Sequence, residues 1–310
     1  MSTDNDERSA LERLLVANLQ EQRRSRRWGV FFKGLFFVWL FLMFLAYSGH
    51  NGDKFSTGSH TALIDLKGEI GGERGMNADE LIGALDSAFD DKHTKGVVLR
   101  INSPGGSPVQ AGQVNDEIRR LRAKHPKIPL YVVVDDLCAS GGYYIAAAAD
   151  KIFVDKASLV GSVGVLMNGF GFTEALKKLG VERRLMTAGE NKGFLDPFSP
   201  LRPKEVEHAK EMLQEVHRQF IHVVREGRGK RLKETPEMFS GLVWSGEKSI
   251  ELGLADGLGN LDYVAREVIK AEDIVDYSPQ ENIAERLARR IGSSIGDAVR
   301  PWALDRANIR

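Results

Sequence analysis

The sequence LYVVVDDLCASGGYYIAAAA, residues 130–149, decides the fold class of this chain. It opens with a short run of β-branched and aromatic residues, which is typical of a buried strand. A pair of glycines then separates this run from a series of small residues that favours a helix. We therefore predict a strand over residues 130–134, a glycine-rich loop over 135–142 and a helix over 143–149.

Short apolar runs and amphipathic stretches alternate on both sides of this segment. Further strands are predicted at residues 62–66, 96–101, 151–154 and 181–187, and helices at 77–89, 109–123, 172–179 and 203–227. Strands that alternate with helices are the sequence pattern of an α/β domain. The expected fold class is therefore α/β, with functional loops at the carboxyl ends of the strands.

The composition excludes several classes of protein. The 310 residues carry 43 basic and 43 acidic side chains, so the formal net charge is zero, and there is a single cysteine, Cys138. A neutral chain does not bind nucleic acid through a global positive field. One cysteine forms neither an intramolecular disulfide nor a cysteine-rich zinc site. We expect no cofactor and no metal.

Residues 28–47, WGVFFKGLFFVWLFLMFLAY, contain one charge, Lys33, and are apolar on every face. About 20 apolar residues in a helix span a bilayer core, so we predict a transmembrane anchor rather than a buried core helix. The apolar region is too long for a cleaved signal peptide. Four arginines precede it within residues 23–27, and residues 48–53 after it contain no Lys or Arg. This asymmetry predicts a single-pass protein of the bacterial inner membrane, with its N-terminus in the cytoplasm and the remainder in the periplasm.

The chain therefore divides into five segments. Residues 1–27 form a cytoplasmic N-terminal segment, 28–47 the anchor, 48–60 a linker, 61–280 the folded periplasmic domain and 281–310 a C-terminal amphipathic tail. Apolar residues of the tail recur four apart among arginines. We predict that the tail packs on the domain or on a neighbouring subunit, with binding to a membrane surface as the alternative.

Two glycine-rich loops follow predicted strands, NSPGGS at residues 102–107 and DDLCASGG at 135–142. The first lacks the spacing of a phosphate-binding motif. Adjacent glycines can also direct their backbone N–H groups at a carbonyl oxygen that becomes negative during acyl transfer. This function requires a nucleophile nearby. Ser140 in the second loop is the candidate, and the alternative is a serine that only caps the following helix.

A nucleophilic serine needs a base. None of the seven histidines lies in a glycine-rich loop, which argues against a triad containing histidine. A neutral lysine can serve instead. Lys192 lies in the loop TAGENKGFLDPFSP, residues 187–200, with glycines on both sides and apolar residues after it. The alternative is an ordinary solvated lysine.

These segments together resemble the signal peptide peptidase A family in its short, single-repeat form. The matching motifs, in order, are NSPGG at 102–106, ASGGYYI at 139–145, ADKI at 149–152, GSVGV at 161–165 and the loop around Lys192. The resemblance covers roughly residues 62–272. It implies the fold of the Clp protease subunit and crotonase superfamily, a spiral of stacked ββα units.

The resemblance implies a membrane-anchored serine endopeptidase with a Ser-Lys dyad. Ser140 matches the nucleophile, Lys192 the general base, and Ser162 a serine that orients the lysine. The amides of Gly106 and Gly141 match the oxyanion hole. The implied substrates are remnant signal peptides and misfolded periplasmic segments. The implied assembly is a homo-oligomeric ring or dome, in which Lys192 can meet Ser140 of a neighbouring protomer.

Two other functions remain open. A crotonase-like acyl-CoA enzyme would share the fold and the oxyanion amides, and a non-catalytic membrane scaffold would need neither the serine nor the lysine. Asp135 and Asp136 make the segment before the serine more acidic than the family pattern, which bears on substrate preference. Cys138 is predicted to pack as a small hydrophobe rather than to act as a nucleophile.

Overall fold

The structure is a computed structural model that describes residue 24 and residues 26–44, 58–72 and 75–279. Two units divide the chain between Phe55 and Ser56. In the first unit Arg26–Phe44 is a helix of 19 residues, none of it buried, which is long and apolar enough to cross a membrane. The predicted helix over 28–47 is thus found as far as residue 44. Residues 1–23 and 45–47 and the predicted tail at 281–310 lie outside the described residues.

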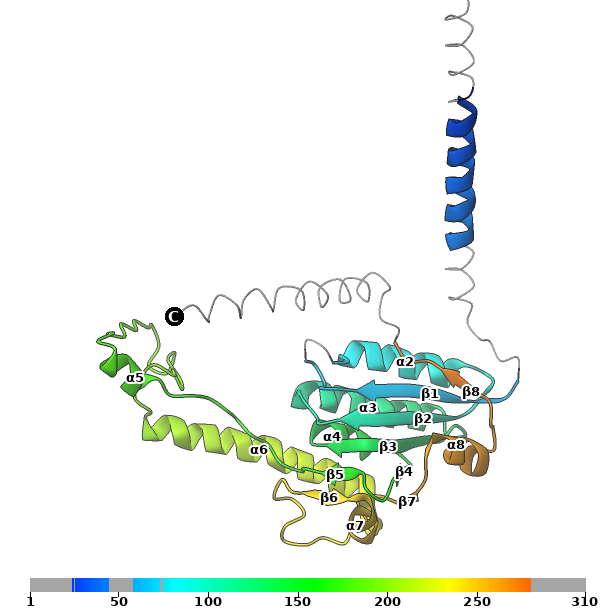
Figure 1. Cartoon of the computed structure of the whole chain (residues 1–310). Coiled ribbons are helices and arrows are strands. Elements are labelled where there is room, and N and C mark those ends of the chain that lie inside the picture. The colour runs from blue at the N-terminus through cyan, green and yellow to red at the C-terminus, as the bar shows by residue number, and fades with distance from the viewer. Residues whose placement is uncertain (1–23, 25, 45–57, 73–74, 280–310) are drawn as a thin grey trace, which may run out of the picture. The chain divides into compact units, whose positions relative to one another are not determined.

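The second unit is built on a mixed sheet of eight strands in which most neighbours are parallel (Figure 1). The strand order is β6-β5-β3-β2-β1-β8, and β4 pairs with both β3 and β7. The elements are β1 His60–Lys67, α2 Ala78–Asp90, β2 Thr94–Ser103, α3 Pro108–Lys124, β3 Leu130–Ala139, α4 Gly141–Ala146, β4 Lys151–Val154, β5 Leu159–Gly161, α5 Thr173–Lys178, α6 Pro203–Arg228, β6 Val243–Ser245, α7 Gly246–Glu251, β7 Gly257–Leu258, α8 Leu261–Tyr263 and β8 Ile274–Asp276. The predicted α/β fold class is confirmed.

Local sequence signals set the helices that cover this sheet. Asn77 and Glu80 form a reciprocal capping box at the start of α2. Ser107 caps α3 through a hydrogen bond from the amide of Gln110, and proline occupies the first turn. These caps fix where α2 and α3 begin, at the ends of the loops that follow β1 and β2.

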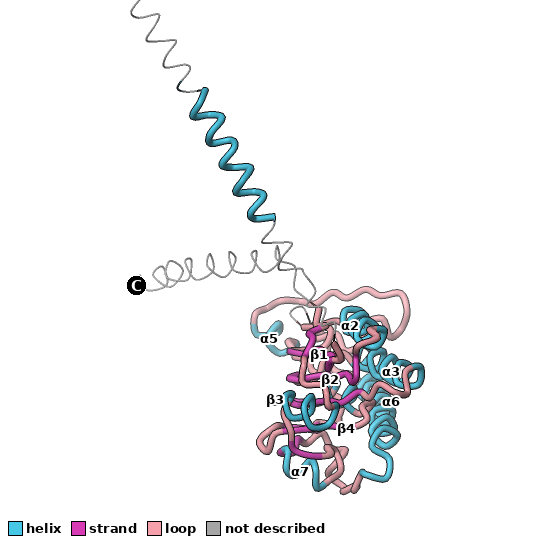
Figure 2. The backbone as a smooth tube through the Cα atoms, turned by 90° about the vertical axis from the view of Figure 1, so that its right-hand side faces the viewer, coloured by secondary structure: helices cyan, strands magenta, loops and turns pink. Residues whose placement is uncertain are grey.

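The main core lies between the sheet and the helices α2, α3, α4 and α6, and Figure 2 shows α2, α3 and α6 on one side of the strands. Leu99, Ile101 and Val134 contribute to it from the central strands and are buried. A smaller cluster on the other face contains Val98 and Phe153, with α8 and the π-helical turn Val264–Ile269 packed over it. Both faces of the central strands are covered, which explains their continuous apolar runs.

The long strand β3 forks the sheet. Tyr131–Val133 pair with β4, whereas Leu137–Ala139 pair with β5. The register of β3 against β2 also shifts, because Ile101 pairs with Val134 but Ser103 pairs with Cys138. This irregularity bends β3 between its two partners and directs its last residues toward β5.

Four predictions about local structure are wrong. Residues 135–139 are strand rather than loop, because β5 extends the pairing of β3 to Ala139. The strand predicted at 181–187 is irregular, because no other strand lies beside it to pair with. His60 is the buried first residue of β1 rather than part of a linker. Helix α4 begins two residues earlier and ends three residues earlier than predicted.

Candidate active site

Ser140 lies at the junction where β3 ends and α4 begins. Its backbone has φ 51°, which L-residues rarely adopt, and two hydrogen bonds hold it there. The amide of Ser140 donates to the carbonyl of Gly161 at 2.9 Å, and its carbonyl accepts from the amide of Tyr144 at 2.9 Å. The side chain makes no capping hydrogen bond to α4. Ser140 is thus the N-cap residue of α4 by position, but its half-buried hydroxyl does not make the capping hydrogen bond and is left for other chemistry.

The loop after β2 lies directly against this junction. A Cβ added to Gly105, which has φ 104°, would sit 2.7 Å from the Cβ of Ser140 and 2.7 Å from the amide nitrogen of Gly141. Only glycine fits such an approach, because any side chain would collide with the serine. The loop is pinned by Ile70, whose amide donates to the Gly105 carbonyl at 2.8 Å and whose carbonyl accepts from the amide of Ser107 at 2.9 Å.

The amides of Gly106 and Gly141 lie on either side of this approach. A Cβ on Gly141 would be 3.3 Å from the amide nitrogen of Gly106. Gly141 opens α4, so its N–H has no acceptor within the helix. Among the described residues neither amide donates a hydrogen bond to another group. Two free amides beside a serine are the geometry that stabilises an oxyanion.

Ser162 reaches the same place from β5. It follows Gly161, the residue that accepts the hydrogen bond from Ser140, and it also has a positive φ, 50°. Its amide donates to the carbonyl of Leu242 at 2.7 Å. The structure thus brings together Ser140, Ser162 and the two glycine amides, four of the five predicted site residues.

Lys192 is the fifth, and it is not brought to Ser140 within one chain. It is exposed in the segment between β5 and α6, called the arm here and comprising residues 164–202. The arm folds on itself, since Phe172 and Phe198 stack with ring centroids 5.5 Å apart and Arg183 pairs with Asp196 at 3.5 Å.

Helix α6 holds the arm away from the sheet. Phe194 of the arm contacts His208 in the first turns of α6, whereas Phe220 packs on Tyr144 of α4 with ring centroids 5.1 Å apart. At 1.5 Å per residue, the helix places these two contacts about 18 Å apart along its axis. Figure 1 shows α5 of the arm at the opposite end of α6 from β3. A dyad within one chain is therefore not assembled.

Cys138 and the histidines do not supply an alternative centre. Cys138 is fully buried in the main core, and burial raises the pKa of its thiol, so the prediction that it packs as a hydrophobe is confirmed. Within the described residues, no histidine hydrogen-bonds Ser140: His60 bonds to Tyr277 and Thr94, and His217 bonds to the carbonyl of Val163.

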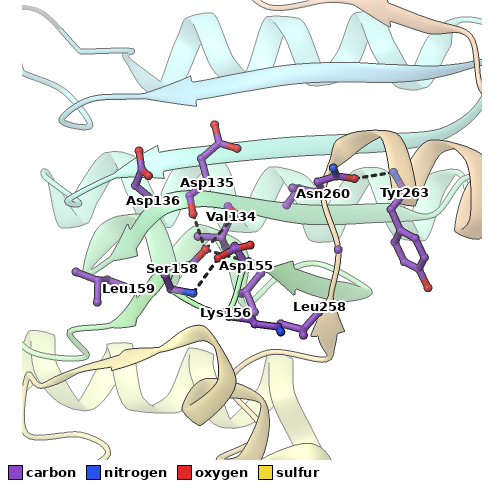
Figure 3. A pocket seen from close by; sticks show the side chains of 14 residues that line it. Val134, Asp135, Asp136, Asp155, Lys156, Ser158, Leu159, Leu258, Asn260 and Tyr263 are labelled. Atoms are coloured by element: carbon purple, nitrogen blue, oxygen red, sulfur yellow. Dashed lines mark hydrogen bonds between the residues drawn. The ribbon is translucent and has the colours of Figure 1, made fainter.

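The two acidic residues before the serine are held by β2. Asp136 accepts a hydrogen bond from the side-chain amide of Asn102 at 3.0 Å, and Asp135 lies 3.9 Å from Arg100. Figure 3 shows both carboxylates pointing away from Ser158, which lies deeper between β3 and β5. Asp136 therefore helps to fix the start of the loop that carries Gly106.

A cavity of about 870 Å³ opens at the fork of β3, and both acidic residues line it. Its walls come from β3, the turn between β4 and β5, and the segment from β7 to α8, including Lys156, Asn260 and Tyr263. None of the five predicted site residues lines this cavity, so it is separate from the candidate active site.

Sequence reasoning missed Ile70 and Leu242, whose backbone hydrogen bonds hold the segments beside Ser140. The run LVWSG at residues 242–246 offered a usable signal, because β-branched and aromatic residues followed by serine and glycine indicate a strand that ends at a helix cap. The described residues contain no group of His, Cys, Asp and Glu that could hold a metal.

The model of peptidase family S49 matches residues 122–275, a range that includes Ser140 and Lys192. The chain is 30% identical over 289 residues to the provisionally named protease MJ0651 of Methanocaldococcus jannaschii, covering 87% of this chain and 91% of that protein. It is 28% identical over 228 residues to Protease 4 of Haemophilus influenzae, covering 72% of this chain and 36% of that protein.

The chain also matches part of a protein that carries another name. It is 45% identical over 215 residues to the Na(+)/H(+) antiporter NhaA of Brucella melitensis, covering 69% of this chain but only 29% of the antiporter. The chain thus spans less than a third of that relative. Among solved structures, a mutant of ClpP1 from Listeria monocytogenes aligns with a TM-score of 0.41 at 18% identity, covering 64% of this chain and 92% of that one.

Proposed function

Because the chain belongs to peptidase family S49, we propose that it is a membrane-anchored serine endopeptidase in which Ser140 is the nucleophile and Lys192 the general base. The observation that carries the proposal is the junction of β3 and α4. There a strained serine, whose side chain makes no capping hydrogen bond, lies beside two amides that have no acceptor within the described part of the chain. This arrangement has a chemical use in acyl transfer.

The proposed reaction has two stages. Oγ of Ser140 attacks the carbonyl carbon of a peptide bond, and its proton passes to the neutral amine of Lys192. The amides of Gly106 and Gly141 donate to the oxygen that becomes negative. The C–N bond then breaks, the lysine returns the proton to the departing amine, and water hydrolyses the acyl-enzyme by the same route. Ser162 orients the lysine in this scheme.

Lys192 is proposed to come from a neighbouring copy of the chain. The separation that α6 imposes supports this, as does the apolar surface of the arm, where Leu166, Phe170, Leu179 and Met186 are 82%, 75%, 75% and 93% exposed. Exposed apolar residues in such number are typical of an interaction surface. A head-to-tail contact, arm to nucleophile, generates a closed ring when its rotation closes.

The substrates and location are proposed by resemblance. Relatives include a protein of Enterococcus faecium provisionally named signal peptide peptidase SppA, 30% identical over 64% of this chain, and the chloroplastic serine protease SPPA of Arabidopsis thaliana, 30% identical over 59% of it. We therefore propose remnant signal peptides and misfolded periplasmic segments as substrates. The Arg26–Phe44 helix and the arginines before it favour an inner-membrane anchor with the domain in the periplasm.

Coexpression of two variants tests the dyad and its source. Ser140→Ala and Lys192→Ala should each abolish cleavage of a fluorogenic peptide. Complexes that contain both variants should regain about a quarter of the wild-type activity, because a random mixture pairs an intact serine with a neighbour's intact lysine at that frequency. No recovery in mixed complexes would place the dyad within one chain. Full activity of either single variant would remove that residue from the mechanism, and an inactive wild type would favour the acyl-CoA enzyme or the scaffold.

A further inference from the structure

Strand β6 fixes the part of β5 to which Ser140 is tied. The two strands pair antiparallel, with Val160 opposite Trp244 and Gly161 opposite Val243. Leu242 is the residue before β6, and its carbonyl accepts a hydrogen bond from the amide of Ser162 at 2.7 Å. The Gly161 carbonyl, which accepts the amide of Ser140, is thus held by a segment about 80 residues later in the chain.

The ring of Trp244 lies directly against Gly161. A Cβ added to Gly161 would be 3.1 Å from Cδ1 of the indole, closer than ordinary contact, and 3.6 Å from Nε1; it would also be 3.1 Å from the carbonyl oxygen of Leu242. Gly161 has φ 115°, a conformation that favours glycine, and its carbonyl accepts the hydrogen bond from the amide of Ser140. The edge of the indole therefore occupies the space into which this peptide would otherwise relax.

The indole N–H does not explain why a tryptophan is present. Nε1 of Trp244 is buried and has no hydrogen-bond partner among the described residues. A buried donor left without an acceptor destabilises a fold by about 1–3 kcal/mol. The ring therefore acts here through its shape, and a phenyl ring would keep an aromatic ring beside Gly161 while removing the unsatisfied donor.

We propose that Trp244 is a positioning residue for the nucleophile, acting through Gly161 and its hydrogen bond to Ser140. The inference rests on the proposed function. Without the ring, the peptide between Gly161 and Ser162 tilts into the vacated space. The Gly161 carbonyl, which accepts the hydrogen bond from the Ser140 amide, moves with this peptide. The serine Oγ then shifts relative to the amide of Gly141, and a misplacement of about 1 Å costs on the order of 10²-fold in rate.

The test compares three substitutions of Trp244 in the full chain, purified in detergent. Trp244→Leu and Trp244→Met remove the ring, whereas Trp244→Phe keeps it. Val243→Ala is the matched control, because Val243 is the neighbouring residue on β6 and its side chain is 44% exposed. The readouts are kcat and KM for a fluorogenic peptide, the rate at which a serine-directed acylating inhibitor acylates Ser140, followed by mass spectrometry, and the thermal unfolding midpoint.

Loss of the ring should lower kcat and the acylation rate together by about 10- to 100-fold, with KM changed less than about twofold. Trp244→Phe and Val243→Ala should keep kcat and the acylation rate within about threefold of wild type, and the phenylalanine variant should unfold at no lower temperature.

The inference is overturned if folded Trp244→Leu and Trp244→Met proteins are acylated at the wild-type rate, or if Trp244→Phe is acylated as slowly as Trp244→Leu. If Leu does not fold, Met decides. A wild type that neither cleaves peptide nor labels at Ser140 overturns both this inference and the proposed function, whereas an active wild type with equally active variants overturns only the role of Trp244.

Discussion

Substitution of Gly105 by alanine places one methyl group against the proposed nucleophile and tests the geometry of the site directly. The added Cβ would lie 2.7 Å from both the Cβ of Ser140 and the amide nitrogen of Gly141, whereas ordinary contact begins at 3.4 Å. Either the loop or the serine must therefore move by about 0.7 Å or more, since atoms resist closer approach. The φ of 104° adds backbone strain of about 1–3 kcal/mol for a residue other than glycine.

The expected result is a fall in kcat on the order of 10²-fold, because the displacement separates the nucleophile from the oxyanion donors. The assay is cleavage of a fluorogenic peptide, with urea unfolding to confirm that the variant is folded. Gly112→Ala is the matched control. It lies in α3, where a Cβ meets nothing within 4 Å, so it should leave kcat unchanged and stabilise the fold by about 0.5–1 kcal/mol. A folded Gly105→Ala protein with wild-type kcat would refute the assignment of this loop to the site.

Three further outcomes are expected. Burial opposes the ionisation of Asp256, but hydrogen bonds and charge from Arg228 outweigh it and lower its pKa. Asp256→Asn should therefore cost about 3–5 kcal/mol in urea unfolding at pH 7 by leaving a buried guanidinium unpaired. Because the folded pKa lies below the unfolded one, this difference should persist at pH 5 and shrink only below about pH 4. Cys138 should resist iodoacetamide at pH 8 until the protein is unfolded, and Cys138→Ala should keep peptidase activity. Phe220→Ala should cost about 3–5 kcal/mol, measured by the same unfolding assay, and should loosen α6 from α4.

The parts of the fold that the sequence predicts well are those where local pattern and tertiary environment agree. β4 was predicted with its observed bounds, and α6 was predicted to within one residue, because a buried run or a long amphipathic period leaves few alternatives. The strand predicted at residues 181–187 is wrong for the converse reason. Val181 and its neighbours have strand propensity, but in the arm they have no partner strand, and propensity alone does not form a sheet.

The candidate site likewise has parts that the sequence predicts and parts that it does not. The glycine loops and Ser140 could be found because each is a local strand-loop-helix signal. The run LVWSG indicates a strand at β6, but the role of β6 could not be predicted, because its pairing with β5 depends on the tertiary structure. Whether Lys192 meets Ser140 in one chain also depends on the direction of α6, and a separation of 52 positions in the sequence does not determine a distance in space.

The two halves of the proposed dyad therefore differ physically. The nucleophile half is strained and fully supported within one chain: Ser140 and Ser162 both have positive φ, and Ile70 and Leu242 hold the flanking backbone from opposite sides. Such strain persists only where packing over-determines it, and here the support comes from the central sheet. The base half lies on an arm that is apolar, exposed and far along a rigid helix. In this arrangement the serine is positioned within each chain, whereas the lysine reaches it only from a neighbouring subunit. Hydrolysis would then depend on contact between subunits, and an isolated chain would carry an ordered but inactive nucleophile.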